Sequence, residues 1–123
     1  MKSGLIKEKS YAFALRTIRL AHWLKEQKEF KIAGQILRSG TAIGSNIEEA
    51  LAGVSRADFI AKMSIASKEA RETHYWLHLL RNSQIASETR ITPLGNECLE
   101  LIRLLTAIVK TSQATLANSK FKT

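Results

Sequence analysis

Apolar residues recur along this chain every three or four positions, which is the spacing of one face of an α-helix. The spacing persists in four stretches, and we expect helices at about residues 5–27, 29–51, 56–82 and 93–116. No stretch has a convincing strand pattern. The sequence therefore predicts an all-α fold and a single domain over residues 1–123.

Two of these boundaries are supported by residues that start helices. Ser55, followed three residues later by Asp58, resembles a capping box and predicts the start of the third helix. Thr92 and Pro93 are typical of an N-cap and a first helical residue, because proline lacks an N–H that this position does not use. Four helices with short first and second connections pack most simply as an antiparallel up-down-up-down four-helix bundle, with the first and last helices as neighbours.

Each predicted helix has an apolar line that we assign to the core. On the first helix this line contains Tyr11, Ala14, Leu15, Ile18, Ala21 and His22. On the second helix it contains Ala33, Ile36, Leu37, Gly40, Ile43, Ile47 and Ala50. On the third helix it contains Phe59, Met63, Ala66, Ala70, Thr73, Leu77 and Leu80. On the fourth helix it contains Leu94, Cys98, Leu101, Leu105 and Ile108.

Two of the helices carry a second apolar stripe, which a single core cannot also bury. On the first helix the second stripe contains Ile6, Phe13, Leu20 and Leu24. On the third helix it contains Ile65, Trp76 and Leu79. Exposed stripes several turns long are typical of contacts between subunits. We expect a homo-oligomer that uses these residues; the alternative is a thick monomeric core with a few exposed apolar side chains.

Charge is distributed unevenly along the 123 residues, which carry a formal net charge of +8. Residues 1–40 contain nine Lys or Arg and three Asp or Glu, residues 41–100 contain six and eight, and residues 101–123 contain four and none. An antiparallel bundle would place the two basic ends side by side and leave the acidic middle near them only through the core. The protein is therefore expected to have a basic surface.

Basic residues on the first helix lie with one aromatic within an arc of about 80°. They are Lys9, Arg16, Arg19 and Trp23, and the polar face of the fourth helix adds Arg103 and Lys110. Cations replace counterions along a nucleic-acid backbone, and an indole can stack on a base. The alternative is a solvated charged face with Trp23 packed into the oligomer contact.

Other chemistry is weakly indicated. His74 and His78 have the spacing of two metal ligands on a helix, but no third ligand accompanies them. Cys98 lies on an apolar line and is expected to be a small core residue. No nucleophile–histidine–acid set or carboxylate pair supports catalysis. We expect neither an enzyme, nor a metal site, nor a cofactor.

Small and polar residues interrupt the apolar pattern of the second helix. Gly40 and Gly44 are expected to let a neighbouring backbone approach closely. A polar group on this helix and the next forms either a buried network or the solvated flank of the helix: Arg38, Asn46, Glu49 and Glu72.

The first residues lack the apolar stretch of a signal peptide, and no apolar run of about 18 residues occurs, so we expect a cytoplasmic protein without membrane contact.

Three segments together resemble the bacterial four-helix-bundle family, also called the 23S rRNA intervening sequence protein family. They are RSGTAIGSNIEE at residues 38–49, SRADF at 55–59 and KEARETHYWL at 68–77. The resemblance implies a small bundle without established enzymatic activity that assembles into a ring, a pentamer in characterised relatives. The family is also similar to the accessory variability protein of diversity-generating retroelements, which implies nucleic acid and a reverse transcriptase as partners.

Two functions remain open from the sequence. The first is a non-enzymatic homo-oligomer that binds structured RNA or DNA through its basic surface. The alternative is a protein-interaction scaffold or accessory subunit, for example of a reverse transcriptase, without direct nucleic-acid binding. The stripe containing Ile65, Trp76 and Leu79, beside Glu69 and Glu72, favours the alternative.

Overall fold

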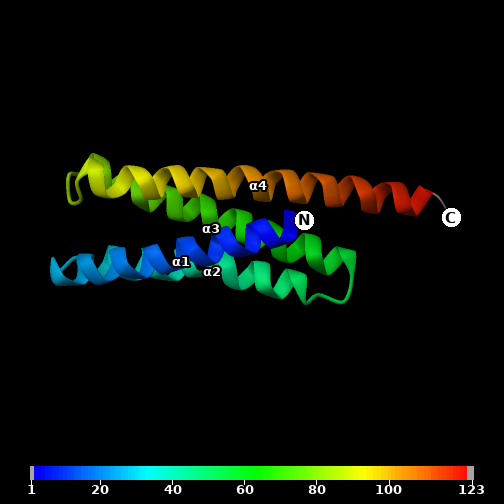
Figure 1. Ribbon diagram of the computed structural model, residues 1–123, viewed down its shortest axis with the longest axis horizontal. Coiled ribbons are helices and arrows are strands. Elements are labelled where there is room, and N and C mark those ends of the chain that lie inside the picture. Colours follow the sequence, from blue (N-terminus) through cyan, green and yellow to red (C-terminus); the bar gives the residue numbers. More distant parts are fainter. Residues whose placement is uncertain (1, 122–123) are drawn as a thin grey trace.

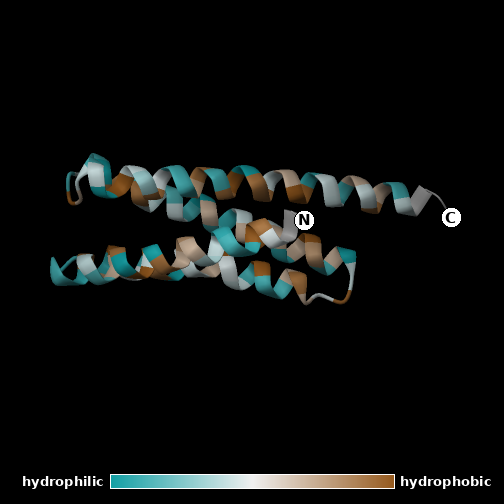
Figure 2. Ribbon diagram, viewed as in Figure 1, coloured by the Kyte–Doolittle hydropathy of each residue, from teal (hydrophilic) through white to brown (hydrophobic). Residues whose placement is uncertain are grey.

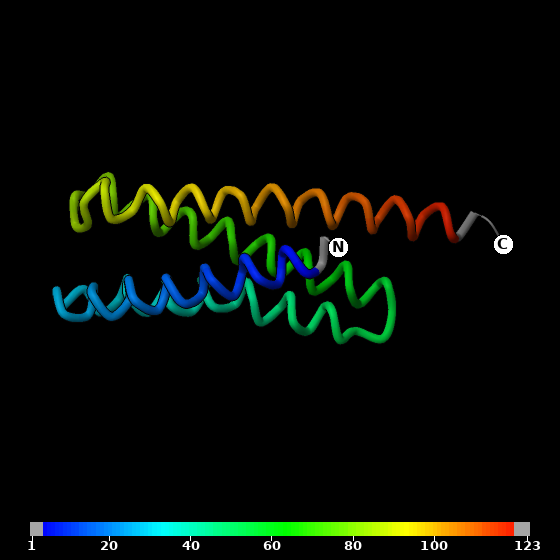
Figure 3. Tube along the Cα trace, viewed as in Figure 1, coloured from blue at the N-terminus to red at the C-terminus, as the bar shows by residue number. Residues whose placement is uncertain are grey.

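The computed structural model describes the backbone of residues 2–121 and the side chains of residues 4–119. This part of the chain contains no strand and has four α-helices: α1 (Lys2–Glu26), α2 (Phe30–Leu51), α3 (Arg56–Asn82) and α4 (Glu88–Phe121). The chain reverses direction at each connection, so that neighbouring helices are antiparallel (Figures 1 and 3). The all-α four-helix bundle predicted from the sequence is confirmed.

Packing between the helices follows their order in the chain. α2 packs extensively on both α1 and α3, and α3 packs extensively on α4, whereas α1 and α4 contact each other much more sparsely. The C-terminal part of α4 extends beyond the ends of the other helices (Figure 1). None of the helices between residues 2 and 121 has a segment long and apolar enough to cross a lipid bilayer. Hydrophobic residues are instead dispersed among polar ones along all four helices (Figure 2).

The start of α3 follows the prediction, and the start of α4 does not. The backbone N–H of Asp58 donates a 3.0 Å hydrogen bond to Ser55 Oγ, as expected of an N-cap. α4 begins at Glu88, five residues before the predicted first residue, and contains Pro93 in its interior. The backbone N–H of Arg90 donates a 3.2 Å hydrogen bond to Ser87 Oγ, which caps the added turn.

Tertiary packing explains why α4 continues through this proline. Ile91 and Leu94 are both buried, and their burial holds the helix together on either side of Pro93. Proline removes one intrahelical hydrogen bond, and burying two large aliphatic side chains offsets that loss. The proline therefore does not mark the boundary of the helix.

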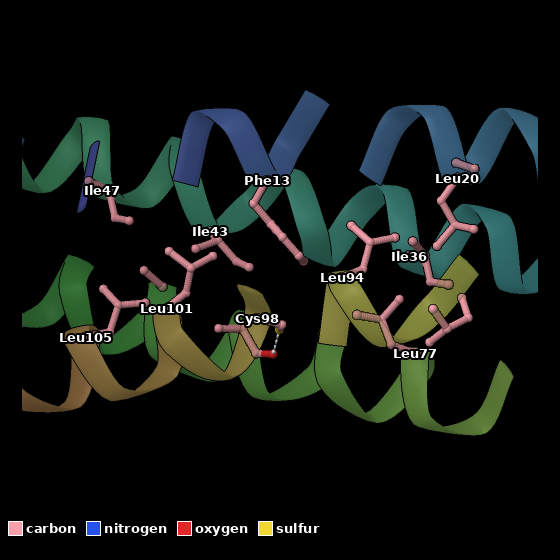
Figure 4. Packing of buried hydrophobic residues seen from close by; sticks show 14 of the residues in the cluster. Phe13, Leu20, Ile36, Ile43, Ile47, Leu77, Leu94, Cys98, Leu101 and Leu105 are labelled. Carbon is pink, nitrogen blue, oxygen red and sulfur yellow. Dashed lines mark hydrogen bonds between the residues drawn. The ribbon is translucent and has the colours of Figure 1, made fainter. Parts of the chain in front are cut away.

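The core is formed mainly by the predicted lines of α2, α3 and α4 (Figure 4). Ile36, Ile43 and Ile47 from α2 face Leu77 from α3 and Leu101 from α4 in this cluster. Phe59, Leu37 and Ile108 are partly buried against it. The three core lines are therefore confirmed.

The two apolar faces of α1 are exchanged relative to the prediction. Phe13 is 1% exposed and Leu20 is 4% exposed, and both belong to the core together with Ile6 and Leu24. The line predicted to be internal is largely external, with exposures of 67%, 41% and 39% at Tyr11, Leu15 and Ile18. Of that line, Ala21 is buried and His22 is exposed. The assignment of Phe13, Leu20 and Leu24 to an oligomer interface is wrong.

Two residues with hydroxyl side chains explain why the internal and external faces of α1 are exchanged relative to the prediction. Ser10 and Thr17 lie on the internal face of α1, although the pattern counts them as polar. Each donates its hydroxyl proton within its own helix, Thr17 to Phe13 O at 2.8 Å and Ser10 to Lys7 O at 3.1 Å. Their polar groups are thereby satisfied without water, so burial costs little.

The small residues of α2 explain why Ser10 and Thr17 are buried. A Cβ added to Gly40 would overlap the Thr17 side chain, and one added to Gly44 would lie 3.6 Å from Ser10 Oγ. α1 and α2 therefore approach closely at these two glycines. The role predicted for Gly40 and Gly44 is confirmed.

Candidate nucleic-acid interface

The junction between α1 and α4 brings together charges of both signs. Lys9 Nζ lies 2.9 Å from Glu100 Oε1, and Arg16 Nη2 lies 2.6 Å from Glu97 Oε1. A second contact at 3.0 Å joins Arg16 Nε to Glu97 Oε2 and makes this ion pair bidentate. The expectation that the acidic middle would approach the basic ends only through the core is therefore wrong. Lys9 and Arg16 are both partly neutralised by α4.

A depression at one end of this junction remains cationic. It has a volume of about 300 Å³ and is lined by Arg16, Arg19, Leu20, Arg90, Pro93 and Leu94. Arg19 and Arg90 form no ion pair among the side chains of residues 4–119, and both are exposed. We call this feature the arginine depression.

Trp23 lies beside the arginine depression and supports one of its cations. The guanidinium carbon of Arg90 lies 4.0 Å from the centroid of the Trp23 ring, in a cation–π contact. Trp23 is half-buried, so one part of the indole packs against the core while the rest is accessible. The contact ties the first turn of α4 to the last turns of α1.

Sequence reasoning missed Arg90 because it placed this residue in a polar connection. The missed signal is Ser87, which precedes Glu88, Thr89 and Arg90 as an N-cap. With the helix starting at Glu88, the rotation per residue turns Arg90 to the same side as Pro93 and Glu97, toward α1.

Next to the arginine depression, the α1–α4 junction contains carboxylates as well as cations. A second depression of about 320 Å³ contains Lys9 and Arg16, but it also contains three carboxylates, from Glu8, Glu97 and Glu100. Positive charge is therefore concentrated at the end of the junction that contains Arg90. Anionic ligands are favoured there over the rest of the groove.

Arg103 and Lys110 do not line either depression. Both are exposed on α4. Arg103 is two residues from the buried Leu101 and Leu105, and two residues turn a helix by about 200°, so it points away from the core. The structure therefore brings together Arg16, Arg19 and Trp23 of the predicted set, and places Arg103 and Lys110 apart from them.

Comparison with known proteins identifies the family of this chain. The model of the family described as 23S rRNA-intervening sequence protein matches residues 3–107. The chain belongs to this family. A crystal structure of a protein with unknown function from the S23 ribosomal protein family of Bacteroides thetaiotaomicron is 48% identical, with a TM-score of 0.86. That similarity covers 89% of this chain and 99% of the other. No curated protein matches the chain.

In this 23S rRNA-intervening sequence family member, the predicted four-residue polar network divides into separate contacts. Arg38 forms ion pairs with Glu72 and, at 3.3 Å, with Glu69, all at least partly accessible to solvent. Glu49 pairs instead with Lys62 of α3 at 3.0 Å, and Asn46 Nδ2 donates to Ala42 O of its own helix at 2.8 Å. The solvated-flank interpretation is therefore the correct one for most of this group.

The predicted stripe on α3 of the family member remains external. Ile65 and Leu79 are each 39% exposed, and Trp76 is partly buried. The indole Nε1 of Trp76 donates a 3.0 Å hydrogen bond to Glu72 Oε2, the carboxylate that also binds Arg38. This stripe and the exposed line of Tyr11, Leu15 and Ile18 lie on different helices, so the bundle has two separate exposed apolar faces.

The surroundings of His74, His78 and Cys98 bear on the weak chemical signals in the sequence. His74 and His78 have ring centroids 6.0 Å apart, and residues 4–119 contain no group of three or more potential metal ligands. Burial lowers the pKa of His74, and the nearby His78 and Arg81 lower it further. Cys98 is a core residue as predicted; its Sγ donates to Ala70 O at 3.1 Å, and burial raises its pKa to about 12.

Proposed function

We propose that this protein is a non-enzymatic, homo-oligomeric bundle that binds structured RNA or DNA through the arginine depression. The convergence of Arg16, Arg19 and Arg90 at one end of the α1–α4 junction carries this proposal. Arg19 and Arg90, which form no ion pair within the described side chains, would contact phosphate oxygens, because guanidinium is always charged and donates several hydrogen bonds. The net charge of +8 supports long-range attraction of a polyanion.

Self-association supports the same function by repeating the site. An exposed apolar face on α1 and another on α3 favour a contact between unlike faces of neighbouring copies. Contacts between unlike faces generate closed rings when the rotation allows it. The five-membered ring implied by the family resemblance would present five arginine depressions, and several weak phosphate contacts on one assembly bind a long polyanion with high avidity.

A salt titration tests the nucleic-acid function. We would measure the affinity of the assembled protein for an RNA hairpin and for duplex DNA at several salt concentrations. The double variant Arg19→Glu/Arg90→Glu is expected to lose about tenfold or more in affinity and to lower the salt dependence by about two phosphate contacts. These positions are preferred to Arg16, because the Arg16 change would also disrupt the ion pair with Glu97.

The matched control reverses one charge elsewhere. Lys31 is exposed in the first turn of α2, where an acidic residue is compatible with the helix dipole. Lys31→Glu is expected to weaken binding far less than either single change in the arginine depression. The proposal would be contradicted if the affinity did not depend on salt concentration. It would also be contradicted if the double variant and Lys31→Glu weakened binding equally. Light-scattering mass must be unchanged in each variant.

Docking of a protein partner is the second candidate function, and the α3 stripe favours it. Ile65 and Leu79 expose aliphatic surface beside the Trp76–Glu72–Arg38 contacts. Apolar side chains next to ordered charges are typical of protein interfaces. If α3 binds a partner protein rather than another copy, Trp76→Glu abolishes partner capture while the assembled mass and helical circular dichroism stay unchanged. Loss of assembled mass would assign the stripe to self-association instead.

A further inference from the structure

The arginine depression is lined by apolar as well as cationic side chains. Its apolar lining consists of the exposed Pro93 and the edges of Leu20 and Leu94, which are 4% and 7% exposed. A site for phosphate alone has no use for this apolar surface. The volume of about 300 Å³ is at the lower end of the range for small-molecule sites. The depression therefore has the composition of a site for a ligand that is anionic and partly apolar.

Arg90 supplies a stacking surface in the same place. A guanidinium group is planar, and the guanidinium carbon of Arg90 lies 4.0 Å from the centroid of the Trp23 ring. Arg90 is exposed and lines the depression, so part of its guanidinium group is available to a ligand. Nucleobases stack on arginine planes in the same way as on aromatic rings. The indole restrains the guanidinium and thereby reduces the entropy lost when a base stacks on it.

The other two arginines of the depression, Arg16 and Arg19, differ in their availability for contact with a phosphate. Arg16 is oriented by its bidentate contact with Glu97, and Arg19 forms no ion pair within the described side chains. Arg19 is thus the cation available for direct contact with a phosphate. The charge of Arg16 is largely balanced by Glu97.

We propose that the arginine depression binds one unpaired nucleotide, with the base stacked on Arg90 and the phosphate on Arg19. This inference rests on the proposed nucleic-acid function and narrows its ligand to an unstacked nucleotide. A base inside a duplex has both faces covered by neighbouring bases, so it cannot stack on the guanidinium plane. The nucleotide is supplied either by a single-stranded segment or by a free mononucleotide.

Arg90→Lys is the decisive variant, because lysine keeps the charge but has no planar group. We would measure the affinities of the full-length protein for a short single-stranded RNA, for the duplex of the same sequence and for adenosine monophosphate. Stacking predicts that Arg90→Lys weakens single-strand binding by about tenfold and leaves duplex binding nearly unchanged.

The three ligands separate the possible outcomes. If Arg90→Lys loses binding to the single strand, and adenosine monophosphate binds the wild type much more weakly than the single strand does, the result supports the proposal and identifies the ligand as part of a nucleic-acid strand. If adenosine monophosphate saturates the site by itself and Arg90→Lys loses this binding, the result supports the proposal and identifies the ligand as a free nucleotide. Wild-type behaviour of Arg90→Lys toward the single strand overturns the nucleotide site but leaves the phosphate-binding function intact. Absence of binding to all three ligands overturns both.

Discussion

Thr73 Oγ1 donates a 2.9 Å hydrogen bond to Ser39 Oγ across the core between α3 and α2. Both side chains are fully buried. Each hydroxyl also has a partner in its own helix, since Ser39 Oγ lies 2.8 Å from Gln35 O and Thr73 Oγ1 lies 2.8 Å from Glu69 O. The interhelical bond therefore links two groups that would be satisfied without it.

The first prediction concerns the energy of this bond. Ser39→Ala and Thr73→Val should each lower the free energy of unfolding by about 1 kcal/mol, because neither change leaves a buried donor without an acceptor. A double-mutant cycle, measured by urea denaturation, should give a coupling energy of about 0.5–1 kcal/mol. Purely additive effects would show that the two hydroxyls bond only within their own helices.

The second prediction uses the glycines of α2 as a matched pair. A Cβ at Gly40 would overlap the Thr17 side chain, whereas a Cβ at Gly34 would meet nothing within 4 Å. Gly40→Ala should destabilise the bundle by about 1–3 kcal/mol through overpacking. Gly34→Ala should stabilise it by about 0.5–1 kcal/mol, because glycine is a poor helix former.

Rescue by a smaller neighbour checks the mechanism of that overpacking. In the Gly40→Ala/Thr17→Ala double variant, the added methyl group occupies space that the shortened Thr17 side chain vacates. Thermal unfolding should therefore show a double variant more stable than the sum of the single changes predicts. Additive losses would mean that Gly40 is required for another reason.

The core positions of α2 were predictable because polar and apolar residues are well separated on this helix. Ile36, Ile43 and Ile47 recur at helical spacing with no competing apolar face on the same helix. α1 lacks this separation, since both of its faces carry large apolar side chains. Which face is internal depends on Gly40 and Gly44 of another helix, and these receive Thr17 and Ser10. That information is not contained in the periodicity of α1.

The candidate site was only partly predictable for a related reason. Arg16, Arg19 and Trp23 share an arc of α1 because of helical rotation alone, and the structure places all three beside α4. The neutralising partners Glu97 and Glu100, and the added cation Arg90, depend on the register between two helices distant in sequence. Register is fixed by core packing, which no local pattern specifies.

The third prediction concerns two connections with strained backbone. Lys28 and Gln84 have φ angles of 66° and 63°, in the left-handed region that disfavours residues with a Cβ. Both follow the C-terminal turn of a helix, where glycine is the preferred residue. Lys28→Gly and Gln84→Gly should each raise the free energy of unfolding by up to about 1 kcal/mol, measured by urea denaturation. A loss of stability would show that the side chain makes a compensating contact.

The fourth prediction concerns the buried thiol. Burial raises the pKa of Cys98 from 9.0 to about 12, so the folded chain retains the proton while the unfolded chain releases it. The contribution of Cys98 to stability is therefore fully present below pH 9 and is lost as the pH rises from 9 toward 12. At pH 8, alkylation by iodoacetamide should follow the rate of global opening. Cys98→Ala should abolish labelling, and fast labelling of the native protein would contradict this burial.

The fifth prediction assigns the two exposed apolar faces to self-association. Leu15→Glu on α1 and Ile65→Glu on α3 each place a charge on a face that would contact a neighbouring copy, so each should reduce the mass measured by light scattering. Helical circular dichroism should be retained, because both side chains lie outside the core. Val54→Glu is the matched control, since Val54 is 99% exposed in the α2–α3 connection and outside both faces.

Mixing the two interface variants separates a contact between unlike faces from a symmetric one. If the α1 face of one copy binds the α3 face of the next, Leu15→Glu and Ile65→Glu each damage one side of the same contact. A mixture then retains one undamaged contact, between the intact α1 face of one variant and the intact α3 face of the other, and should form dimers but no larger closed assembly. Full assembly of the mixture, or an unchanged mass in both single variants, would contradict this arrangement of copies.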